Sequence, residues 1–371
     1  MVGRLAFELA EANEVGIICF RAGEEPPVDE RLLERLSFVE YVPKAARRKL
    51  GSRLLRAGAI LWGWARGEPR FVTNYVSAML ERRLQALATD WRPDVVQFEF
   101  HVLAGYTLPS DAVRVVVVHE PGGDAAGPAG LLSRIDAWAW KRYEHRVLSA
   151  ADAVVVFSDE DRRTVERSGP RVVERIPFGA DVVDLPEAPA GPPTVLYWGN
   201  YSHGPNLAAA NRLVKAILPR VQQELPSARL SLAGRLPVRG RLPLGPGVDH
   251  LGFVPDVASL LGAATIVAAP LSTGGGMRVK VAESLAGGKA VVASQRAMAG
   301  IDATPGKHYA AAESDDEFAA TISRLLRDDD ERAALEVAAK QFASTNLRWQ
   351  DAARSYLKLY GRLMQPRVGA E

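Results

Sequence analysis

The sequence predicts an α/β protein made of two doubly wound domains, on the strength of three observations. Short apolar runs rich in β-branched residues alternate with helix-like stretches along the whole chain. Most runs are continuous rather than alternating, as in strands that are buried on both faces of a parallel sheet. The Pro-rich segment 184–193 (DLPEAPAGPP) interrupts the pattern near the middle, and a fresh apolar run follows it directly. Strand–helix–strand repetition on both sides of such a linker indicates two parallel sheets, each covered by helices.

The predicted strands fall into two series, one on each side of the linker. The first series is 15–20, 94–98, 113–118, 153–157 and 171–176, and the second is 194–198, 229–233, 248–251, 265–269 and 290–293. Helices are predicted between them, for example at 130–150, 207–224 and 279–287. A last helix at about 350–363 is expected to cross back onto the first domain. The predicted organisation is therefore an N-terminal domain (1–183), a linker (184–193), a C-terminal domain (194–348) and a returning helix (349–371).

The chain opens on a predicted helix, at 2–12, ahead of the strand at 15–20. A doubly wound domain ordinarily begins with a strand and a Gly-rich turn before that helix. The sequence therefore predicts either that the true start lies upstream of Met1 or that the first sheet is one strand short.

Composition narrows the classes of protein to consider. Of the 371 residues, 47% are hydrophobic and 24% are charged, the usual balance of a globular protein with enough apolar material for two cores. A formal net charge of +2 predicts no nucleic-acid partner. Cys19 is the only cysteine, so no disulfide forms within the chain, which suits a reducing cytoplasm. No apolar run is long enough to cross a membrane, and no signal peptide is predicted, so a cytoplasmic protein is expected.

The segment 270–283 (PLSTGGGMRVKVAE) carries the clearest chemistry. It follows a predicted strand and runs into a helix. Consecutive glycines let a backbone approach a ligand closely, and helix N-termini favour anions such as phosphate. Two cations lie in the same turn, and a carboxylate about one turn later suits the paired hydroxyls of a ribose. The predicted phosphate and ribose site is Gly274, Gly275, Gly276, Arg278, Lys280 and Glu283.

The second half of the chain resembles glycosyltransferase family 4, the retaining enzymes with the GT-B fold. The matching blocks are VLYWGNYSHGPN (195–206), ARLSLAGR (228–235), VDHLGFVPDV (248–257), IVAAPLSTGGGMRVKVAESLAGGKAVVAS (266–294) and NLRW (346–349). Five blocks in this order over about 150 residues are far more specific than one Gly-rich turn. The first half resembles the family more loosely. The resemblance implies two Rossmann-like domains that face a central cleft, and a nucleotide sugar as the donor.

The resemblance also implies roles for single residues. In the family's Glu-x7-Glu motif the second glutamate binds the ribose, and its position matches Glu283. The first, which contacts the donor sugar, falls on Gly275, as in a Gly-rich branch of the family. Family members place an Arg and a Lys after the strand at 194–198, where this chain has Asn200, so Arg278 and Lys280 are expected to bind the diphosphate with help from Arg235. The loop around Phe253 resembles the one that contacts the nucleobase.

Two polar residues end predicted strands in the first half. Glu99 follows VVQF and His119 follows VRVVVV, so both are expected at the carboxyl edge of the sheet. A histidine at a strand end is more often structural than catalytic. The HEPGG sequence at 119–123 resembles the family loop whose histidine contacts the donor sugar, which makes His119 and Glu99 the candidate catalytic residues.

Two charged segments have competing interpretations. The stretch 43–67 carries seven Lys or Arg residues and no acidic one, interleaved with apolar residues. It predicts either a cationic amphipathic helix on a membrane surface or a solvated basic helix that packs on the core. Asp328, Asp329 and Asp330 form an Asp-x-Asp pattern, but they precede a helix, so they are predicted to cap it rather than to bind a metal.

The expected activity is the retaining transfer of a sugar from a nucleotide sugar to a glycan, lipid-linked or small-molecule acceptor, without a metal or cofactor. Such a role suits the synthesis of cell-envelope polysaccharides, at the inner face of the membrane. Two alternatives stay open: a non-catalytic glycosyltransferase-like subunit and, less favoured, a nucleotide-sugar epimerase of the same fold. The base, the sugar, the acceptor and the oligomeric state do not follow from the sequence.

Overall fold

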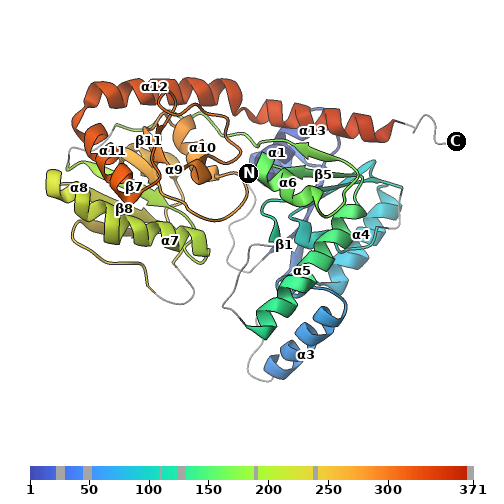
Figure 1. Cartoon of the computed structure of the whole chain (residues 1–371). Coiled ribbons are helices and arrows are strands. Elements are labelled where there is room, and N and C mark those ends of the chain that lie inside the picture. The colour runs from blue at the N-terminus through green and yellow to red at the C-terminus, as the bar shows by residue number, and fades with distance from the viewer. Residues whose placement is uncertain are drawn as a thin grey trace. The chain divides into compact units, whose positions relative to one another are not determined.

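The computed structural model describes residues 1–21, 30–44, 52–108, 111–122, 130–187, 191–236 and 241–365, with the side chains of 52–56 excepted. The chain forms two compact units (Figure 1). Unit 1 comprises Met1–Ile176 and Gln350–Glu371, and unit 2 comprises Pro177–Trp349. Residues 177–183 therefore belong to unit 2, although the sequence had assigned them to the N-terminal domain.

Unit 1 alternates strands and helices, as the sequence predicted. In chain order the elements are α1 (Val2–Leu9), β1 (Gly16–Arg21), α2 (Glu30–Arg35), β2 (Phe38–Pro43), α3 (Ser52–Ala65), η1 (Val72–Tyr75), α4 (Ala78–Asp90), β3 (Val95–Glu99), η2 (His101–Leu103), β4 (Val113–Val117), α5 (Leu131–Ser149), β5 (Ala153–Val156), α6 (Asp159–Glu166), β6 (Val173–Arg175) and α13 (Trp349–Met364). All strand pairs are parallel. The described strands form two sheets, β1-β2 and β3-β4-β5-β6.

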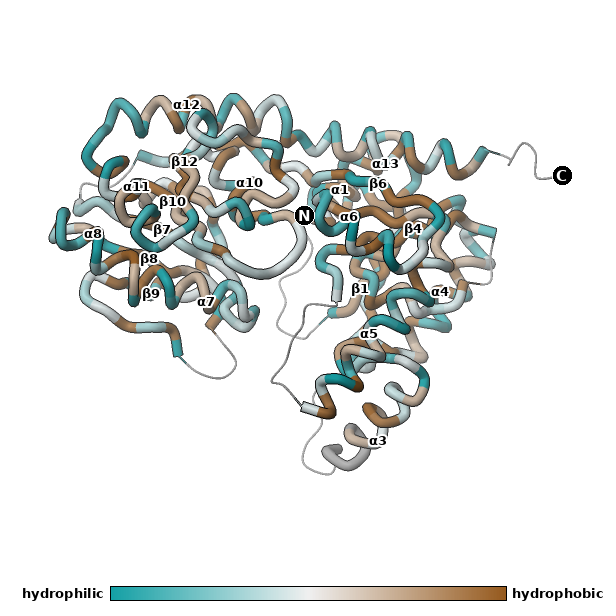
Figure 2. The backbone as a smooth tube through the Cα atoms, in the orientation of Figure 1, coloured by the Kyte–Doolittle hydropathy of each residue, from teal (hydrophilic) through white to brown (hydrophobic). Residues whose placement is uncertain are grey.

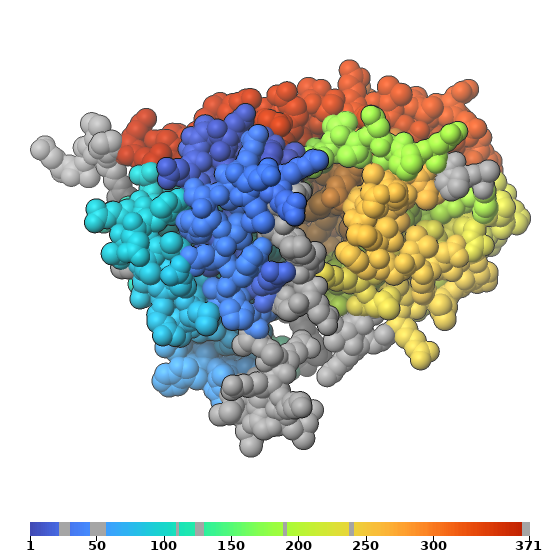
Figure 3. Space-filling view, turned by 180° about the vertical axis from the view of Figure 1, so that it is seen from behind, coloured from blue at the N-terminus to red at the C-terminus, as the bar shows by residue number. Residues whose placement is uncertain are grey.

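The core of unit 1 lies between these strands and α5. Val116 of β4 and Val154 of β5 are fully buried, and they pack with Tyr143 and Val147 of α5. Figure 2 shows the hydrophobic tube along β4. Strand β1 departs from the prediction that the strands are buried on both faces, because all six of its residues are only half-buried. Figures 1 and 3 both show the C-terminal helix α13 against the N-terminal part of the same unit.

Unit 2 is a parallel sheet of six described strands. Its elements are β7 (Thr194–Trp198), α7 (Gly204–Arg212), η4 (Leu213–Ile217), α8 (Leu218–Glu224), β8 (Arg229–Ala233), β9 (Val248–Gly252), α9 (Val257–Gly262), β10 (Ile266–Ala269), α10 (Val279–Ala286), β11 (Val291–Ala293), η5 (Gln295–Met298), β12 (Ala310–Ala311), α11 (Asp315–Arg327) and α12 (Asp329–Asn346). The strand order is β12-β11-β10-β7-β8-β9. The reversal between β7 and β10 is the switch point at which doubly wound sheets bind ligands.

The structure corrects the predicted elements in four places. Strand β2 was missed because its sequence, FVEYVP, is short and interrupted by Glu40. Strand β12 was missed because it has only two residues. The helix predicted at 207–224 begins earlier, at Gly204, and its turn Leu213–Ile217 is a π-helix just before Pro219. The first helix ends at Leu9 rather than at residue 12.

None of the helices in the described part of the chain is long and apolar enough to cross a membrane.

Candidate functional site

The Gly-rich loop of unit 2 joins the buried strand β10 to helix α10, as predicted. Gly274 and Gly276 adopt positive φ angles of 96° and 74°, which residues with a side chain rarely tolerate. Arg212 holds the start of the loop in place, because its Nη1 donates a hydrogen bond to the Pro270 carbonyl at 2.8 Å. Arg278 folds back on the loop and donates to the Gly275 carbonyl at 2.6 Å. The loop is therefore held in shape by side chains around it, with its glycines next to the first turn of α10.

Lys280, in the first turn of α10, is hydrogen-bonded to two residues that were not among the site residues predicted from the sequence. Its Nζ donates to Asn206 Oδ1 at 2.6 Å and to the Tyr197 hydroxyl at 3.2 Å. The Tyr197 hydroxyl also donates to Asn206 Oδ1, at 3.0 Å. Burial, and next the charge of Arg278, lowers the pKa of Lys280 to about 7. The ammonium is therefore fixed at the switch point between β7 and β10, in surroundings that favour an anionic ligand.

The backbone turns after β7 and β8 approach each other too closely for side chains. Gly234 has a φ angle of 129°, and a Cβ placed there would lie 1.9 Å from the Gly199 carbonyl oxygen. A Cβ at Gly199 would lie 2.8 Å from Lys280 Nζ. The turn after β9 joins the same group, because the Gly234 N–H donates to the Gly252 carbonyl at 2.6 Å. Gly199, Gly234 and Gly252, at the ends of three strands, thus form one closely packed backbone platform beside the Lys280 ammonium.

The other predicted donor-binding residues lie around this platform in unit 2. Asn200 is exposed, and its Oδ1 accepts from the Ser202 N–H at 3.0 Å, so it shapes its own turn. The guanidinium of Arg235 lies 5.6 Å from the centroid of the Phe253 ring, and that ring is 64% exposed. Glu283 lies one turn after Lys280 on α10, and burial raises the pKa of its carboxyl group. An exposed aromatic ring after β9, and a lysine and a carboxylate on α10, are therefore all part of unit 2.

In unit 1 the structure brings His119 and Glu99 together. Glu99 pairs in register with Val117, and His119 follows two residues later, so both lie at the carboxyl edge of the sheet as predicted. His119 Nε2 lies 2.7 Å from Glu99 Oε2, and the side chains are only 11% and 19% exposed. The imidazole stacks on the Phe100 ring at 3.8 Å between centroids and meets Phe157 edge-on. A half-buried carboxylate paired with a histidine can orient a polar ligand group and stabilise charge.

The backbone of Phe100 has an unusual conformation. Its φ angle is 70°, although it is not a glycine. This costs conformational energy of about 1–3 kcal/mol, and such residues cluster at functional sites. Here the positive φ accompanies the stacking of the Phe100 ring on His119.

Sequence reasoning missed Gln97 and Tyr360. Gln97 Nε2 donates to Glu99 Oε1 at 2.7 Å, and the Tyr360 hydroxyl of α13 donates to Gln97 Oε1. The period-2 alternation of a strand puts Gln97 on the same face as Glu99, so that contact could have been anticipated. No signal in the sequence points to Tyr360.

His101, by contrast, is turned into the interior. It is 4% exposed, and its Nε2 lies 3.3 Å from Glu144 Oε1, which also accepts from the Gly122 N–H at 2.6 Å. Of the two residues, Glu99 at the end of β3, and not His101, therefore pairs with His119. Gly123, the last residue of the predicted His119 loop, lies outside the described residues, as do 45–51 of the basic segment 43–67.

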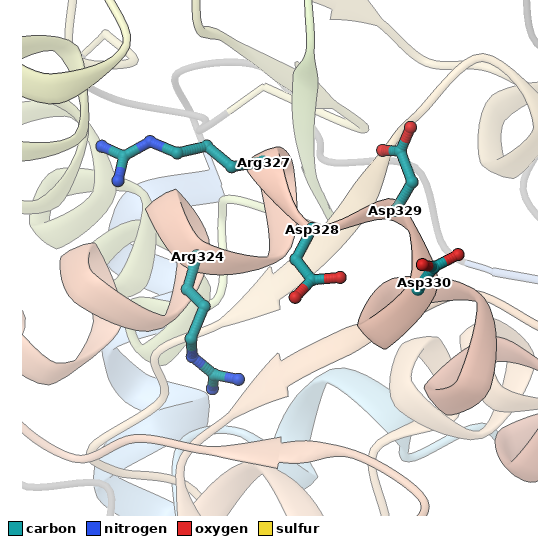
Figure 4. Close-up of a pocket in the computed structure, with 5 residues that line it drawn as sticks. All are labelled: Arg324, Arg327, Asp328, Asp329 and Asp330. Atoms are coloured by element: carbon teal, nitrogen blue, oxygen red, sulfur yellow. The ribbon is translucent and has the colours of Figure 1, made fainter.

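Asp328 caps helix α12, as predicted. Its Oδ1 accepts from the Glu331 N–H at 2.8 Å. An open hollow of about 600 Å³ lies at this turn between α11 and α12, lined by Arg324, Arg327, Asp328, Asp329 and Asp330 (Figure 4). Figure 4 shows the two arginines and the aspartates on separate helix ends. The hollow is made by capping and surface ion-pair residues, and none of the predicted site residues lines it.

Both units match families of known proteins. The family described as "Glycosyl transferases group 1" matches residues 192–328, and the family described as "Glycosyl transferase 4-like domain" matches residues 1–179. The two matches together cover most of the chain. None of the curated proteins is similar enough in sequence to match it.

Solved structures show the same fold at low sequence identity. Sucrose-phosphate synthase from Thermosynechococcus elongatus is 16% identical, with a TM-score of 0.70, over 98% of this chain and 92% of that one. WaaG, described as a glycosyltransferase involved in lipopolysaccharide biosynthesis, is 13% identical with a TM-score of 0.67, over 96% and 94%. HepE of Anabaena, in complex with UDP-glucose, is 15% identical with a TM-score of 0.65, over 97% and 94%. The chain therefore has the GT-B fold, as the sequence predicted.

Proposed function

Because the chain is a glycosyltransferase that belongs to the group 1 family, we propose that it transfers a sugar from a nucleotide sugar to an acceptor, with retention at the anomeric carbon. The observation that carries this proposal is that Lys280 is hydrogen-bonded to Tyr197 and Asn206 beside the Gly-rich loop. HepE, a similar structure, is described in complex with UDP-glucose, which supports a nucleotide sugar as the donor.

The diphosphate of the donor is proposed to bind at the switch point of unit 2. Lys280 supplies the positive charge, and the first turn of α10 adds the partial charge of a helix N-terminus. Arg278 keeps the loop closed around its glycines through its bond to the Gly275 carbonyl. Glu283, one turn further along α10, suits the ribose hydroxyls. The loop around Phe253 suits the base, because the family resemblance implies that its backbone contacts the nucleobase.

The sugar of the donor is proposed to meet His119, which the resemblance places near the reacting carbon. Glu99 holds the imidazole through Nε2, at 2.7 Å. During transfer, negative charge develops on the departing diphosphate while the sugar becomes oxocarbenium-like. Preorganised cations such as Lys280 stabilise that charge without reorganising. The bond between the anomeric carbon and the diphosphate oxygen breaks, and the acceptor oxygen bonds to that carbon on the same face of the sugar while the leaving phosphate takes the acceptor proton. The configuration is retained, and the step needs neither a metal nor a cofactor.

The acceptor is proposed to be lipid-linked or part of a growing glycan. The enzyme is proposed to bind it in the cytoplasm, at an anionic membrane surface. Helices α3 and α5 of unit 1 are joined by the Trp64 Nε1 bond to Asp136 Oδ1, at 2.7 Å. Large apolar side chains are exposed on both: Leu61 (62%), Trp62 (68%), Leu131 (72%), Leu132 (60%) and Trp138 (51%). Arg134 of α5 is exposed, and so are Arg66 and Arg70, which follow the end of α3. Apolar side chains among cations suit the interface of an anionic bilayer. The involvement of WaaG, a similar structure, in lipopolysaccharide biosynthesis supports a role in envelope glycans.

The donor site is tested with a panel of nucleotide sugars and matched lysine variants. Thermal shift identifies the donor, and its affinity is then measured for Lys280→Met and for Lys289→Met. Lys289 is a fair control because it follows the opposite end of α10, donates to the Ala264 carbonyl at 2.7 Å, and also has a pKa lowered by burial. We expect Lys280→Met to weaken donor binding at least tenfold and Lys289→Met to leave it unchanged. Equal effects of the two variants would refute the assignment.

The membrane surface is tested separately, with vesicles of anionic and of zwitterionic lipid. A double variant, Leu131→Ser with Leu132→Ser, should lose sedimentation with anionic vesicles. Leu244→Ser, which removes a side chain that is 77% exposed in unit 2, should retain it. Binding that survives the double variant would remove this surface from the proposal.

A further inference from the structure

The carboxylate of Glu99 is held at both of its oxygens. Oε2 lies 2.7 Å from His119 Nε2, and Oε1 accepts from Gln97 Nε2 at 2.7 Å. Gln97 Oε1 in turn accepts from the hydroxyl of Tyr360. Four side chains from β3, the loop after β4 and helix α13 thus form one continuous chain of hydrogen bonds within unit 1. Residues 97 and 360 are 263 positions apart in the sequence.

With Glu99 as a carboxylate, the direction of every hydrogen bond in this chain follows. An ionised carboxylate only accepts hydrogen bonds, so Gln97 must offer its amide nitrogen to Glu99, and His119 Nε2 must carry a proton. The amide oxygen of Gln97 then faces Tyr360, whose hydroxyl must donate. Burial raises the pKa of the Tyr360 phenol, so this donor keeps its proton at any physiological pH. In the neutral imidazole, Nδ1 remains as the acceptor nitrogen.

The position of Tyr360 follows from the anchoring of its helix. Ala352, Ala353 and Tyr356 of α13 are buried, Tyr356 to 2% exposure, and this sets the rotation of the helix about its axis. Tyr360 lies four residues after Tyr356, on the same face of the helix. Helix α13 is therefore the element that closes the hydrogen-bond chain behind Glu99.

We propose that Tyr360 and Gln97 are positioning residues, which fix Glu99 and thereby lock His119 in its Nε2–H tautomer and in its ring orientation. The proposal deepens the proposed function and rests on it for the catalytic role of His119. The ring is confined in other directions by its stack on Phe100 and its edge contact with Phe157. These aromatic contacts restrict where the ring lies, whereas the Glu99 carboxylate is the contact within the described residues that distinguishes one ring nitrogen from the other.

The test is the tautomer of His119 in the donor-free enzyme, read from its imidazole ¹⁵N shifts and assigned with a His119→Gln variant. We expect the Nε2–H form in the native protein. Tyr360→Phe and Gln97→Leu should both give a mixture with the Nδ1–H form. In turnover assays the same variants should lower kcat about tenfold, with the donor KM nearly unchanged, because the diphosphate is bound elsewhere.

Arg362→Gln is the matched control on the same helix. Arg362 Nη2 lies 2.8 Å from Glu174 Oε2 of β6, so this variant loosens α13 from the sheet without touching the hydrogen-bond chain. We expect a native tautomer and a native kcat. A native tautomer in both Tyr360→Phe and Gln97→Leu would overturn the proposal, and so would an equal loss of kcat in Arg362→Gln. If the native enzyme turned over no nucleotide sugar, the proposed function would fail, while the tautomer measurement would still decide the positioning role.

Discussion

Donor binding should be coupled to the uptake of a proton by Lys280. Burial and the charge of Arg278 lower its pKa from 10.5 to about 7 in the protein without ligand. At pH 8 about nine in ten Lys280 side chains are therefore neutral, whereas at pH 6 only about one in ten is. A bound diphosphate brings negative charge to the ammonium and raises that pKa again.

The expected magnitude follows from this pKa. Binding should take up nearly one proton per donor at pH 8 and about a tenth of a proton at pH 6. The donor affinity should then fall as pH rises above 7, by up to about tenfold per unit, until the pH reaches the pKa of the bound state. The diphosphate of a nucleotide sugar does not titrate in this range, so the proton comes to the protein.

Isothermal titration calorimetry measures this uptake when each pH is run in two non-phosphate buffers that differ in ionisation enthalpy. The probe is the nucleotide sugar that gives the largest thermal shift. Lys280→Met should abolish the uptake at pH 8, and Lys289→Met should preserve it. Equal proton uptake at pH 6 and pH 8, or uptake that persists in Lys280→Met, would refute the role of Lys280.

Three further predictions concern unit 2. Burial raises the pKa of Glu283, and ribose hydroxyls donate to its ionised form, so donor affinity should weaken as pH falls through that raised pKa. Glu283→Gln should bind the donor more weakly and should lose this weakening at low pH, as binding titrations from pH 5 to pH 8 will show. Gly234→Ala forces a Cβ against the Gly199 carbonyl and should destabilise unit 2 by about 1–3 kcal/mol or more, seen as a lower melting temperature with lost donor binding. Ser314→Ala breaks the capping box with Glu317 at the start of α11 and should cost about 1 kcal/mol of stability while leaving donor affinity unchanged. A loss of donor affinity would contradict our view that this helix cap lies apart from the donor site.

The sequence was sufficient for those parts of the fold that depend on local pattern. The predicted strands 194–198 and 229–233 formed at the predicted bounds. The continuous apolar runs at 153–157 and 265–269 became β5 and β10, all of whose residues are buried, since a strand buried on both faces needs an apolar side chain at every position. The Gly-rich turn before α10 was predicted because positive φ angles need glycine, and two of its three glycines adopt them. Strand β2 escaped because Glu40 interrupts its apolar run; the structure shows Arg83 of α4 paired with that glutamate.

The candidate site also has a part that the sequence could predict and a part that required the tertiary structure. Glu99, His119 and Lys280 could be selected because each lies at the end of a strand or in the first turn of a helix, where side chains reach the edge of a sheet. Glu283 could be selected from its spacing after the Gly-rich loop and from the family motif. That Glu99 and His119 are partners required the register of β3 and β4, which places their ends side by side. Their role in catalysis stays a prediction.

By itself the sequence determined the fold class, the two-domain plan and the Gly-rich loop, because these depend on residues that are neighbours along the chain. Only the tertiary structure decided which side chains hold the candidate site in place. Tyr197 grips Lys280 across 83 residues, and Tyr360 reaches Gln97 across 263. Such contacts depend on how helices are rotated and how strands are aligned in the packed units. A hydroxyl on a buried helix carries no local signal of the partner that packing brings to it.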